Sequence, residues 1–359
     1  MTELGGLIAR RIALTGPISL ADFMAEALGH PRLGYYRRAL PVGAAGDFTT
    51  APEVSQMFGE LIGAWLAERW LAMAHPSPVR LVELGPGRGT LMADALRATR
   101  GVPGFHAAID LHLVDTNAPM REAQREALQA HHPTWHERLD EVPDGPLLLV
   151  ANEFFDALPV RQFHRTATGW RERMVGLDEQ GRLRLALAPG TTPFAPLLPD
   201  AGEGAEAELS EAGRSLASAI GARIARDGGW ALIIDYGLES AGRAASLQAV
   251  RGHRGAGILD RPGETDLSAH VDFAALAASS GVATYGPVSQ GAFLRRLGLA
   301  ARAQALKRRA NAVQANAIDA ASARLIGPDQ MGTLFRVLAL GDGKSAPPAG
   351  FMDTPSDAT

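Results

Sequence analysis

The sequence predicts an α/β fold with a doubly wound parallel sheet, a helical N-terminal extension and an inserted α+β region. Three observations support this prediction. After residue 78, short apolar runs alternate with helical stretches, which is typical of strand–helix–strand units. Before residue 78, apolar residues recur mainly at helical spacing. Between residues 161 and 228, a block with turn signals and strand-like alternation interrupts the pattern.

Residues 1–78 are the predicted N-terminal extension. Two helices are expected first, followed by a loop rich in Gly and Pro. Another helix is expected from Ala51, with its apolar face against the main domain. Thr50 and Glu53 have the spacing of a capping box, with Thr50 at the N-cap and Glu53 at N3.

Residues 79–160 and 229–342 are predicted to form the main domain. Helical stretches follow the first two of its expected strands. These strands are the apolar runs VRLVEL, IDLHLV, PLLLVAN and ALIIDY, and FRVLAL near the C-terminus is expected to close the sheet.

Two further segments complete the organisation. Residues 161–228 are predicted to be an inserted cap or substrate region, with one or two hairpins and then a helix over 205–226. The Gly-, Arg- and His-rich stretch 240–270 is expected to be a long loop. Residues 343–359 are expected to be a disordered tail.

Composition excludes several classes of function. The 359 residues include no cysteine, which excludes disulfides and thiolate chemistry and fits a reducing, cytoplasmic location. The formal net charge of −4 gives no reason to expect nucleic-acid binding. There is no apolar run of the length that a membrane span requires, and the N-terminus does not resemble a signal or transit peptide.

The segment VELGPGRGT, Val82–Thr90, is the strongest chemical signal. A strand ends there, glycines follow, and a helix begins at once, which lets a ligand approach the backbone. The spacing G-x-G-x-G departs from the dinucleotide pattern G-x-G-x-x-G, and an acid precedes it. A preceding acid suits the sulfonium and ammonium groups of S-adenosylmethionine, although a turn that binds nothing is an alternative. The candidate cofactor residues in this segment are Glu83, Gly85, Pro86, Gly87, Gly89 and Thr90.

Polar residues also end the next two expected strands. Asp115 lies where it can accept hydrogen bonds from ribose hydroxyls, and Asn152 is a further candidate for cofactor binding. Glu153 and Asp156 follow with two phenylalanines between them, which predicts a wall beside the cofactor. A strand-end turn with solvated acids is the alternative.

Several segments together resemble the MidA-like S-adenosylmethionine-dependent methyltransferases, from the first helices to about residue 340. They are GDFTTAPEVSQMFGELIGAWL, LVELGPGRGTLMADALR, ANEFFDALPV, DLSAHVDFAALA and GPVSQGAFLRRLGL. The resemblance implies a class I, Rossmann-like methyltransferase core that uses S-adenosylmethionine and releases S-adenosylhomocysteine. The mitochondrial members of this family are similar to protein arginine methyltransferases that act on a subunit of respiratory complex I. The implied partner is therefore a protein with an acceptor arginine, and no metal is expected.

The predicted reaction is in-line methyl transfer, in which the enzyme mainly positions the two reactants. For a guanidinium acceptor, the expected carboxylates are Glu153 and Asp156, with Asp47 and Glu53 contributing from the N-terminal segment. His270 is a candidate proton acceptor, with a helix-cap role as its alternative. The alternative functions are methylation of a small molecule and a SAM-binding assembly factor with little turnover, whereas an NAD(P)-dependent reaction is disfavoured.

Six more residues complete the expectations. Phe48 and Thr49, in the polar entry of the helix from Ala51, are expected to be a wall or lid of the cofactor pocket. Asp235 and Tyr236 end the fourth strand and are candidates for closing that pocket. Asp266 and Asp272 are expected to be helix-cap or first-turn acids.

Overall fold

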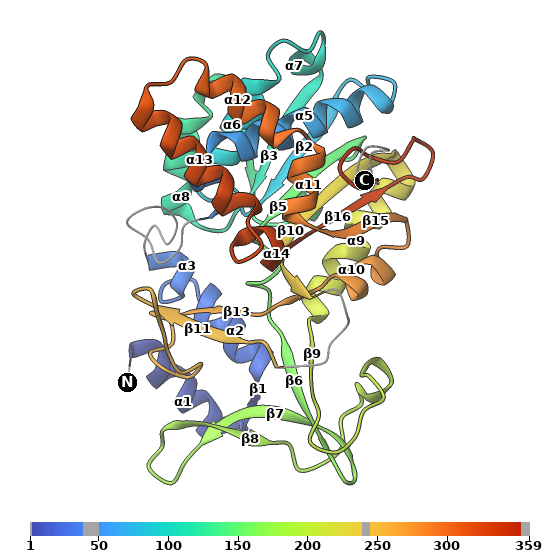
Figure 1. Cartoon of the computed structure of the whole chain (residues 1–359). Coiled ribbons are helices and arrows are strands. Elements are labelled where there is room, and N and C mark those ends of the chain that lie inside the picture. Colours follow the sequence, from blue (N-terminus) through green and yellow to red (C-terminus); the bar gives the residue numbers. More distant parts are fainter. Residues whose placement is uncertain (1, 39–49, 239–244, 353–359) are drawn as a thin grey trace.

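The structure is a computed structural model that describes residues 2–38, 50–238 and 245–352, so Asp47, Phe48 and Thr49 lie outside the described residues. It has two parts (Figure 1). One is a large α/β core, and the other combines N-terminal helices with two small antiparallel sheets.

An eight-stranded mixed sheet forms the centre of the core. Its order is β15-β16-β10-β5-β2-β3-β4, with β14 beside β10. The strands from β10 to β4 are parallel, as predicted, but β16 lies antiparallel between β10 and β15 instead of at an edge. The strands are β2 Val79–Leu84, β3 Ile109–Val114, β4 Thr134–His136, β5 Leu147–Asn152, β10 Gly229–Leu238, β14 Val271–Asp272, β15 Ala283–Ser289 and β16 Phe335–Gly341.

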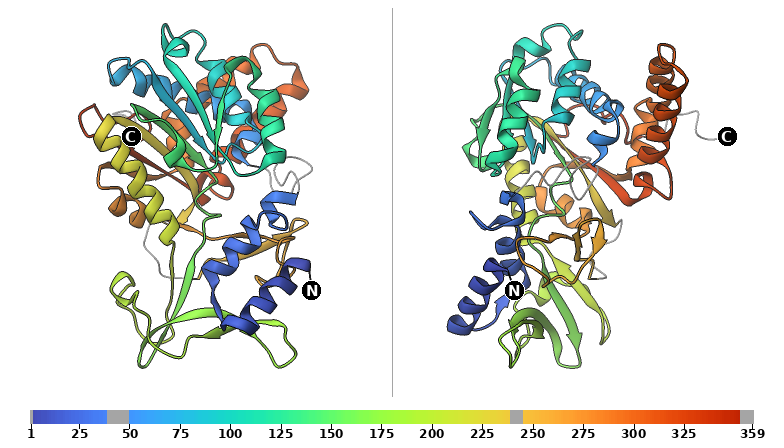
Figure 2. Two further views of the ribbon diagram at one scale, coloured as in Figure 1. Left: turned by 180° about the vertical axis from the view of Figure 1, so that it is seen from behind. Right: turned by 90° about the vertical axis from the view of Figure 1, so that its left-hand side faces the viewer.

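Helices cover both faces of this sheet, which confirms the doubly wound α/β class (Figure 2). Successive strand residues alternate between the faces: Leu81 and Val150 belong to one core cluster, and Val82 and Leu149 to the other. The first face carries α5 Gln56–Ala72, α6 Thr90–Ala98, α11 Gln290–Arg296, α12 Leu299–Lys307 and α13 Ala312–Ile326, and the second carries α9 Glu211–Asp227 and α10 Phe273–Ser280. Further core helices are α7 Phe105–Ala108, α8 Ala118–Ala127 and α14 Met331–Leu334.

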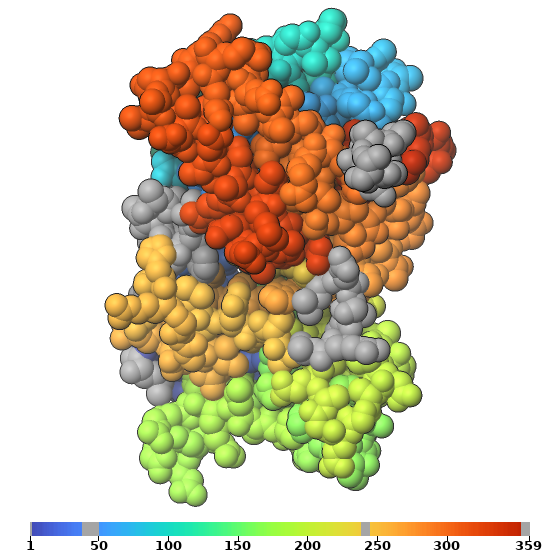
Figure 3. Space-filling view, in the orientation of Figure 1, coloured from blue at the N-terminus to red at the C-terminus, as the bar shows by residue number. Residues whose placement is uncertain are grey.

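We call the other part the second unit. Its larger sheet has the order β1-β7-β6-β9, with β8 on β7, and Ile18 of β1 pairs with Val175 of β7. A three-stranded sheet, β12-β11-β13, lies nearby, and its segment crosses the middle of the face in Figure 3. The elements are α1 Glu3–Thr15, β1 Ile18–Ser19, α2 Leu20–Gly29, α3 Tyr35–Arg38, β6 Arg161–Thr166, β7 Gly169–Leu177, β8 Leu183–Leu187, β9 Glu206–Leu209, β11 Gln248–Arg251, β12 Arg254–Gly255 and β13 Asp266–Ser268.

After residue 200, the structure differs from the predicted organisation in three places. The helix expected over 205–226 begins only at Glu211, after β9, and packs on the central sheet as α9. The stretch 240–270, expected to be a loop, contains β11–β13. Residues 343–352 of the tail expected to be disordered pack on the core, where Phe351 lies against Phe293.

The helix expected from Ala51 is divided in two. Thr50 is the N-cap residue of α4, Ala51–Val54, but its side chain makes no capping hydrogen bond. Glu53 instead accepts a hydrogen bond from Thr90 Oγ1 at 2.6 Å, so the predicted capping box is wrong. Ser55 is extended and its side chain caps α5, which begins at Gln56.

No helix within the described ranges has both the length and the hydropathy needed to cross a bilayer.

Candidate active site

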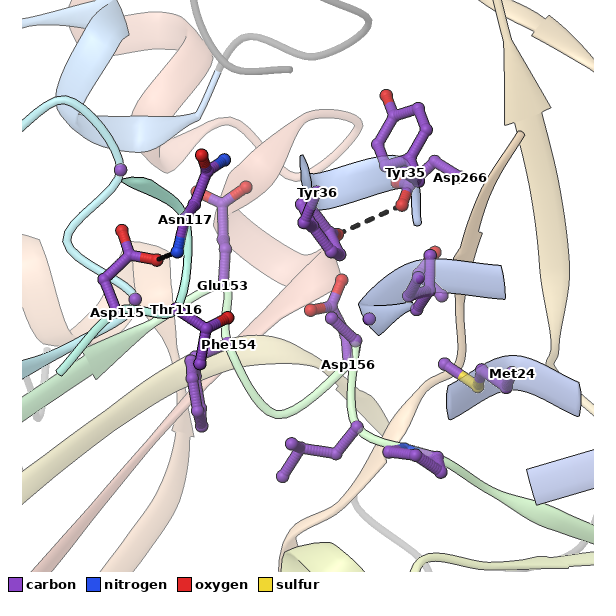
Figure 4. A pocket seen from close by; sticks show the side chains of 18 of the residues that line it. Met24, Tyr35, Tyr36, Asp115, Thr116, Asn117, Glu153, Phe154, Asp156 and Asp266 are labelled. Atoms are coloured by element: carbon purple, nitrogen blue, oxygen red, sulfur yellow. Dashed lines mark hydrogen bonds between the residues drawn. The ribbon is translucent and has the colours of Figure 1, made fainter. Parts of the chain in front are cut away.

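A cavity of about 450 Å³ lies between the carboxyl ends of the central strands and the second unit (Figure 4). Ligands of open α/β sheets bind at this edge. Of the predicted site residues, those that line the cavity are Gly85, Gly87, Asp115, Glu153, Asp156 and Tyr236. The others in the described ranges do not line it, and they are Glu53, Glu83, Pro86, Gly89, Thr90, Asn152, Asp235 and His270.

The glycine loop joins β2 to α6 through left-handed backbone. Gly85 and Gly87 have φ values of +62° and +52°, a region that side chains rarely occupy. A Cβ at Gly85 would lie 2.7 Å from the ring of Phe154, so no side chain fits there. A Cβ at Gly87 would meet no described atom within 4 Å, because this residue faces the open cavity. A ligand can therefore approach the backbone at Gly87.

Glu83 lies behind the loop as a buried carboxyl group. Its side chain is 3% exposed, and its Oε2 has no hydrogen-bond partner among the described residues. Burial, together with the charge of Asp115, raises the pKa of Glu83 to about 8. A ligand that brings a cation or a hydrogen-bond donor would satisfy this oxygen.

Asp115 lies directly after β3 and is held from two sides. Its Oδ1 accepts a hydrogen bond from the Asn117 N–H at 2.7 Å, and its Oδ2 accepts one from Gln124 Nε2 at 2.7 Å. Burial nevertheless raises its pKa. The carboxylate is thus fixed at the wall of the cavity, as its predicted role in binding ribose requires.

Gln124, on α8, is a residue that the sequence reasoning missed. It is fully buried, and its Nε2 also donates to the Gly87 carbonyl at 2.8 Å, while its Oε1 accepts from Trp135 Nε1 at 2.8 Å. One amide therefore links the glycine loop to Asp115. The sequence does contain a sign of this role, because Gln124 lies on the same helical stripe as Met120 and Leu128, which are buried. A polar side chain on such an apolar stripe is commonly buried and hydrogen-bonded.

Asp235 holds the turn that follows β5. Its buried Oδ2 accepts hydrogen bonds from the backbone N–H groups of Phe154, Phe155 and Asp156, at 3.0, 2.8 and 3.2 Å. Burial, with the charge of Glu153, raises the pKa of Asp235 to about 7. Asp235 does not line the cavity but fixes the turn that presents acids to it, whereas its neighbour Tyr236 does line it.

Glu153 lies at the centre of the cavity wall. Its Oε1 accepts hydrogen bonds from the Ala51 N–H at 3.0 Å and from Asn152 Nδ2 at 3.1 Å. Burial raises the pKa of Glu153 to about 7, and the charge of Asp156 adds to this effect. Its φ of +52° is unusual for a residue other than glycine and is typical of functional sites. The first N–H of α4 therefore contacts the candidate site, and Thr50 lines the cavity.

The second unit supplies an acidic wall that the sequence reasoning missed. Tyr36 of α3 donates a hydrogen bond to Asp266 Oδ1 of β13 at 3.0 Å, and both residues line the cavity near Asp156 (Figure 4). Asp266 is therefore not a helix-cap residue, as expected, although Asp272 does cap α10 by accepting from the Ala275 N–H. Burial, followed by the charges of Asp235 and Asp266, raises the pKa of Asp156.

His270 is not part of this site. It follows the end of β13 and is exposed, and its backbone N–H donates to Ser246 Oγ. Its predicted role as proton acceptor is therefore not supported by its position.

Comparisons with known proteins agree with this geometry. Residues 61–288 match a family described as "Putative S-adenosyl-L-methionine-dependent methyltransferase". The chain is 36% identical over 363 residues to the mitochondrial protein arginine methyltransferase NDUFAF7 of Danio rerio, covering 93% of this chain and 85% of that protein. It is 34% identical to the Homo sapiens protein of the same name, covering 92% and 81%.

A solved structure from Burkholderia thailandensis, bound to S-adenosyl-homocysteine, is similar over nearly the whole chain. The two superpose with a TM-score of 0.84 at 28% sequence identity, covering 99% of this chain and 96% of the other. A native structure from the same organism gives the same TM-score at 29% identity.

Proposed function

Because the chain belongs to this family of S-adenosyl-L-methionine-dependent methyltransferases, we propose that it methylates an arginine side chain of a protein. The observation that carries the proposal is a single cavity that joins the glycine loop to the carboxyl groups of Glu153 and Asp156. The names of the relatives from Danio rerio and Homo sapiens support the choice of acceptor. The resemblance seen in the sequence favours a subunit of a respiratory complex as the substrate. The cytoplasmic location stays a prediction from the sequence.

The cofactor end of the cavity fits S-adenosylmethionine. The unpartnered Oε2 of Glu83 suits a cationic ligand, and the open space at Gly87 admits one close to the backbone. We assign Asp115 to the ribose hydroxyls, with Gln124 holding both Asp115 and the loop in place. The cofactor supplies a methyl group on a positively charged sulfur.

The acids opposite the loop fit a guanidinium acceptor. A guanidinium carries a positive charge at neutral pH, and paired carboxylates orient it by charge-assisted hydrogen bonds. When its nitrogen forms the new bond to carbon, the carbon–sulfur bond breaks and a proton must leave that nitrogen. Glu153, with a pKa of about 7, is suited to take this proton at neutral pH.

A Gly87→Val protein is expected to lose S-adenosylmethionine binding by at least tenfold. The β-branched side chain would enter the cavity and would also be strained at a φ of +52°. Calorimetric titration measures the dissociation constant, and Gly101→Val is the matched control because Gly101 also has open space beside it but lies outside the cavity. Equal affinity in the variant and the wild type would contradict the assignment of the loop.

Incubation with S-adenosylmethionine carrying a labelled methyl group tests the acceptor. In extract from a strain that lacks the protein, we expect label in a protein band and, after hydrolysis, in methylarginine. Label in a small molecule, or in methyllysine, would contradict the proposal. Binding without any transfer would instead favour an assembly factor.

A further inference from the structure

We propose that Tyr36 and Asp266 form, with Asp156, a subsite of the second unit that binds the cationic group of the acceptor. The inference rests on the proposed function and deepens it, because it assigns acceptor selection to residues outside the methyltransferase core. Cofactor binding then belongs to the core, and acceptor binding is completed by α2, α3 and β13.

Tyr36 and Asp266 form a hydrogen bond between segments that are distant in the sequence. Tyr36 and Asp266 are 230 positions apart, yet the Tyr36 hydroxyl donates to Asp266 Oδ1 at 3.0 Å. Asp266 is only 6% exposed. Burial and the nearby charges of Asp266 and Asp156 raise the pKa of Tyr36, so its hydroxyl keeps its proton and remains a donor to Asp266. A hydroxyl oxygen has two lone pairs and a carboxylate oxygen accepts more than one hydrogen bond, so both groups can also accept from a ligand.

The charge of the lining favours a cation. Among the charged residues of the described lining, acids outnumber bases, and Arg37 is the one basic residue there. The guanidinium of Arg37 donates to the Thr116 carbonyl, directly after Asp115 at the cofactor end. The acids of the lining are Asp115, Glu137, Glu153, Asp156 and Asp266. A bound guanidinium would relieve the repulsion between the carboxyl groups of Asp156 and Asp266.

Apolar side chains complete the subsite. Met24 and Leu28 of α2 line the same cavity, together with Leu158 and Pro159, which follow the acidic turn. This combination suits an aliphatic stem that ends in a flat, charged group with several N–H donors. It does not suit an anionic or a purely apolar acceptor.

Agmatine, which carries a guanidinium on an aminobutyl stem, is a direct probe of this subsite. With S-adenosylhomocysteine present, saturation-transfer NMR should detect agmatine bound to the wild-type protein. N-carbamoylputrescine, which has a neutral urea in place of the guanidinium, should bind much more weakly. Asp266→Asn should weaken agmatine binding about tenfold, and Tyr36→Phe severalfold, because each removes part of a charged hydrogen-bond network. Neither should change the S-adenosylmethionine dissociation constant by more than twofold.

Tyr285→Phe is the matched control, because Tyr285 packs against Trp230 in the core and does not line the cavity. Thermal unfolding of all variants checks that each is folded. No agmatine binding to the wild type, or equal binding to Asp266→Asn, Tyr36→Phe and the wild type, would overturn the inference.

Turnover separates this inference from the proposed function. If the wild type methylates protein arginine but both variants keep its KM for that protein, the inference fails and the proposed function stands. If the agmatine pattern holds but no arginine is methylated, the proposed function fails and the cationic subsite stands.

Discussion

A Glu153→Gln enzyme is expected to bind S-adenosylmethionine with nearly wild-type affinity but to lose roughly 10²- to 10⁴-fold in turnover, the usual range for a general acid or base. Gln keeps the shape of the side chain and can still accept from the Ala51 N–H, so the turn should survive. It cannot take up a proton or balance the acceptor charge. Single-turnover transfer of a labelled methyl group measures the loss.

The pH dependence of activity, compared between the wild type and Glu153→Gln, is a second test of the role of Glu153. Because the pKa of Glu153 is raised to about 7, the carboxylate is present above that pH and lost below it. Wild-type kcat/KM should therefore rise with pH through about 7. A similar rise that persists in Glu153→Gln would point to Asp235, whose pKa is also raised to about 7. Glu179→Gln, in an exposed turn, is the control, and full activity in Glu153→Gln would refute the role of Glu153.

A Glu83→Gln protein should be more stable than the wild type without cofactor, yet bind S-adenosylmethionine at least tenfold more weakly. Burial raises the pKa of Glu83 from an ordinary 4.5 to about 8, so the folded state disfavours the charged form. Wild-type stability then decreases as pH rises from about 4.5 to about 8, and Gln has no charge to bury. The expected difference in unfolding free energy is on the order of 3 kcal/mol at pH 7 and close to zero at pH 4.

Denaturant unfolding at pH 4 and pH 7, with and without S-adenosylmethionine, measures both effects. Cofactor should stabilise the wild type strongly and the variant weakly, because ligand binding adds to the stability of the folded state. A variant that is less stable at pH 7, or that binds the cofactor as well as the wild type, would show that Glu83 is a satisfied structural acid.

The sequence predicts those parts of the site that depend on neighbours along the chain. The glycines after β2, and Asp115 and Glu153 after their strands, occupy the edge expected of them because parallel strands end together there. Contacts between distant segments were missed. The bond from Tyr36 to Asp266 joins α3 to β13, and no local pattern encodes it.

The predictions for Glu53 and His270 also failed because contacts between distant segments decide where these side chains lie. Glu53 has the correct spacing for a capping box, but Thr90, in a different helix, competes successfully for its carboxylate. Asp266 and Ser268 of β13 line the cavity. His270 lies in the same segment but follows the end of β13 and does not line the cavity. Spacing identifies which residues are near in sequence and does not determine which side chains meet across the fold.

The pairing of Ile18 with Val175 has a consequence for biosynthesis. Ribosomes add roughly 5–20 residues each second, so the N-terminal helices emerge on the order of ten seconds before their partner strand. Throughout that interval Ile8, Phe23 and Met24, which are buried in the finished protein, have no second-unit sheet to cover them. The nascent chain therefore presents an apolar surface that a chaperone can hold until the partner strand is made.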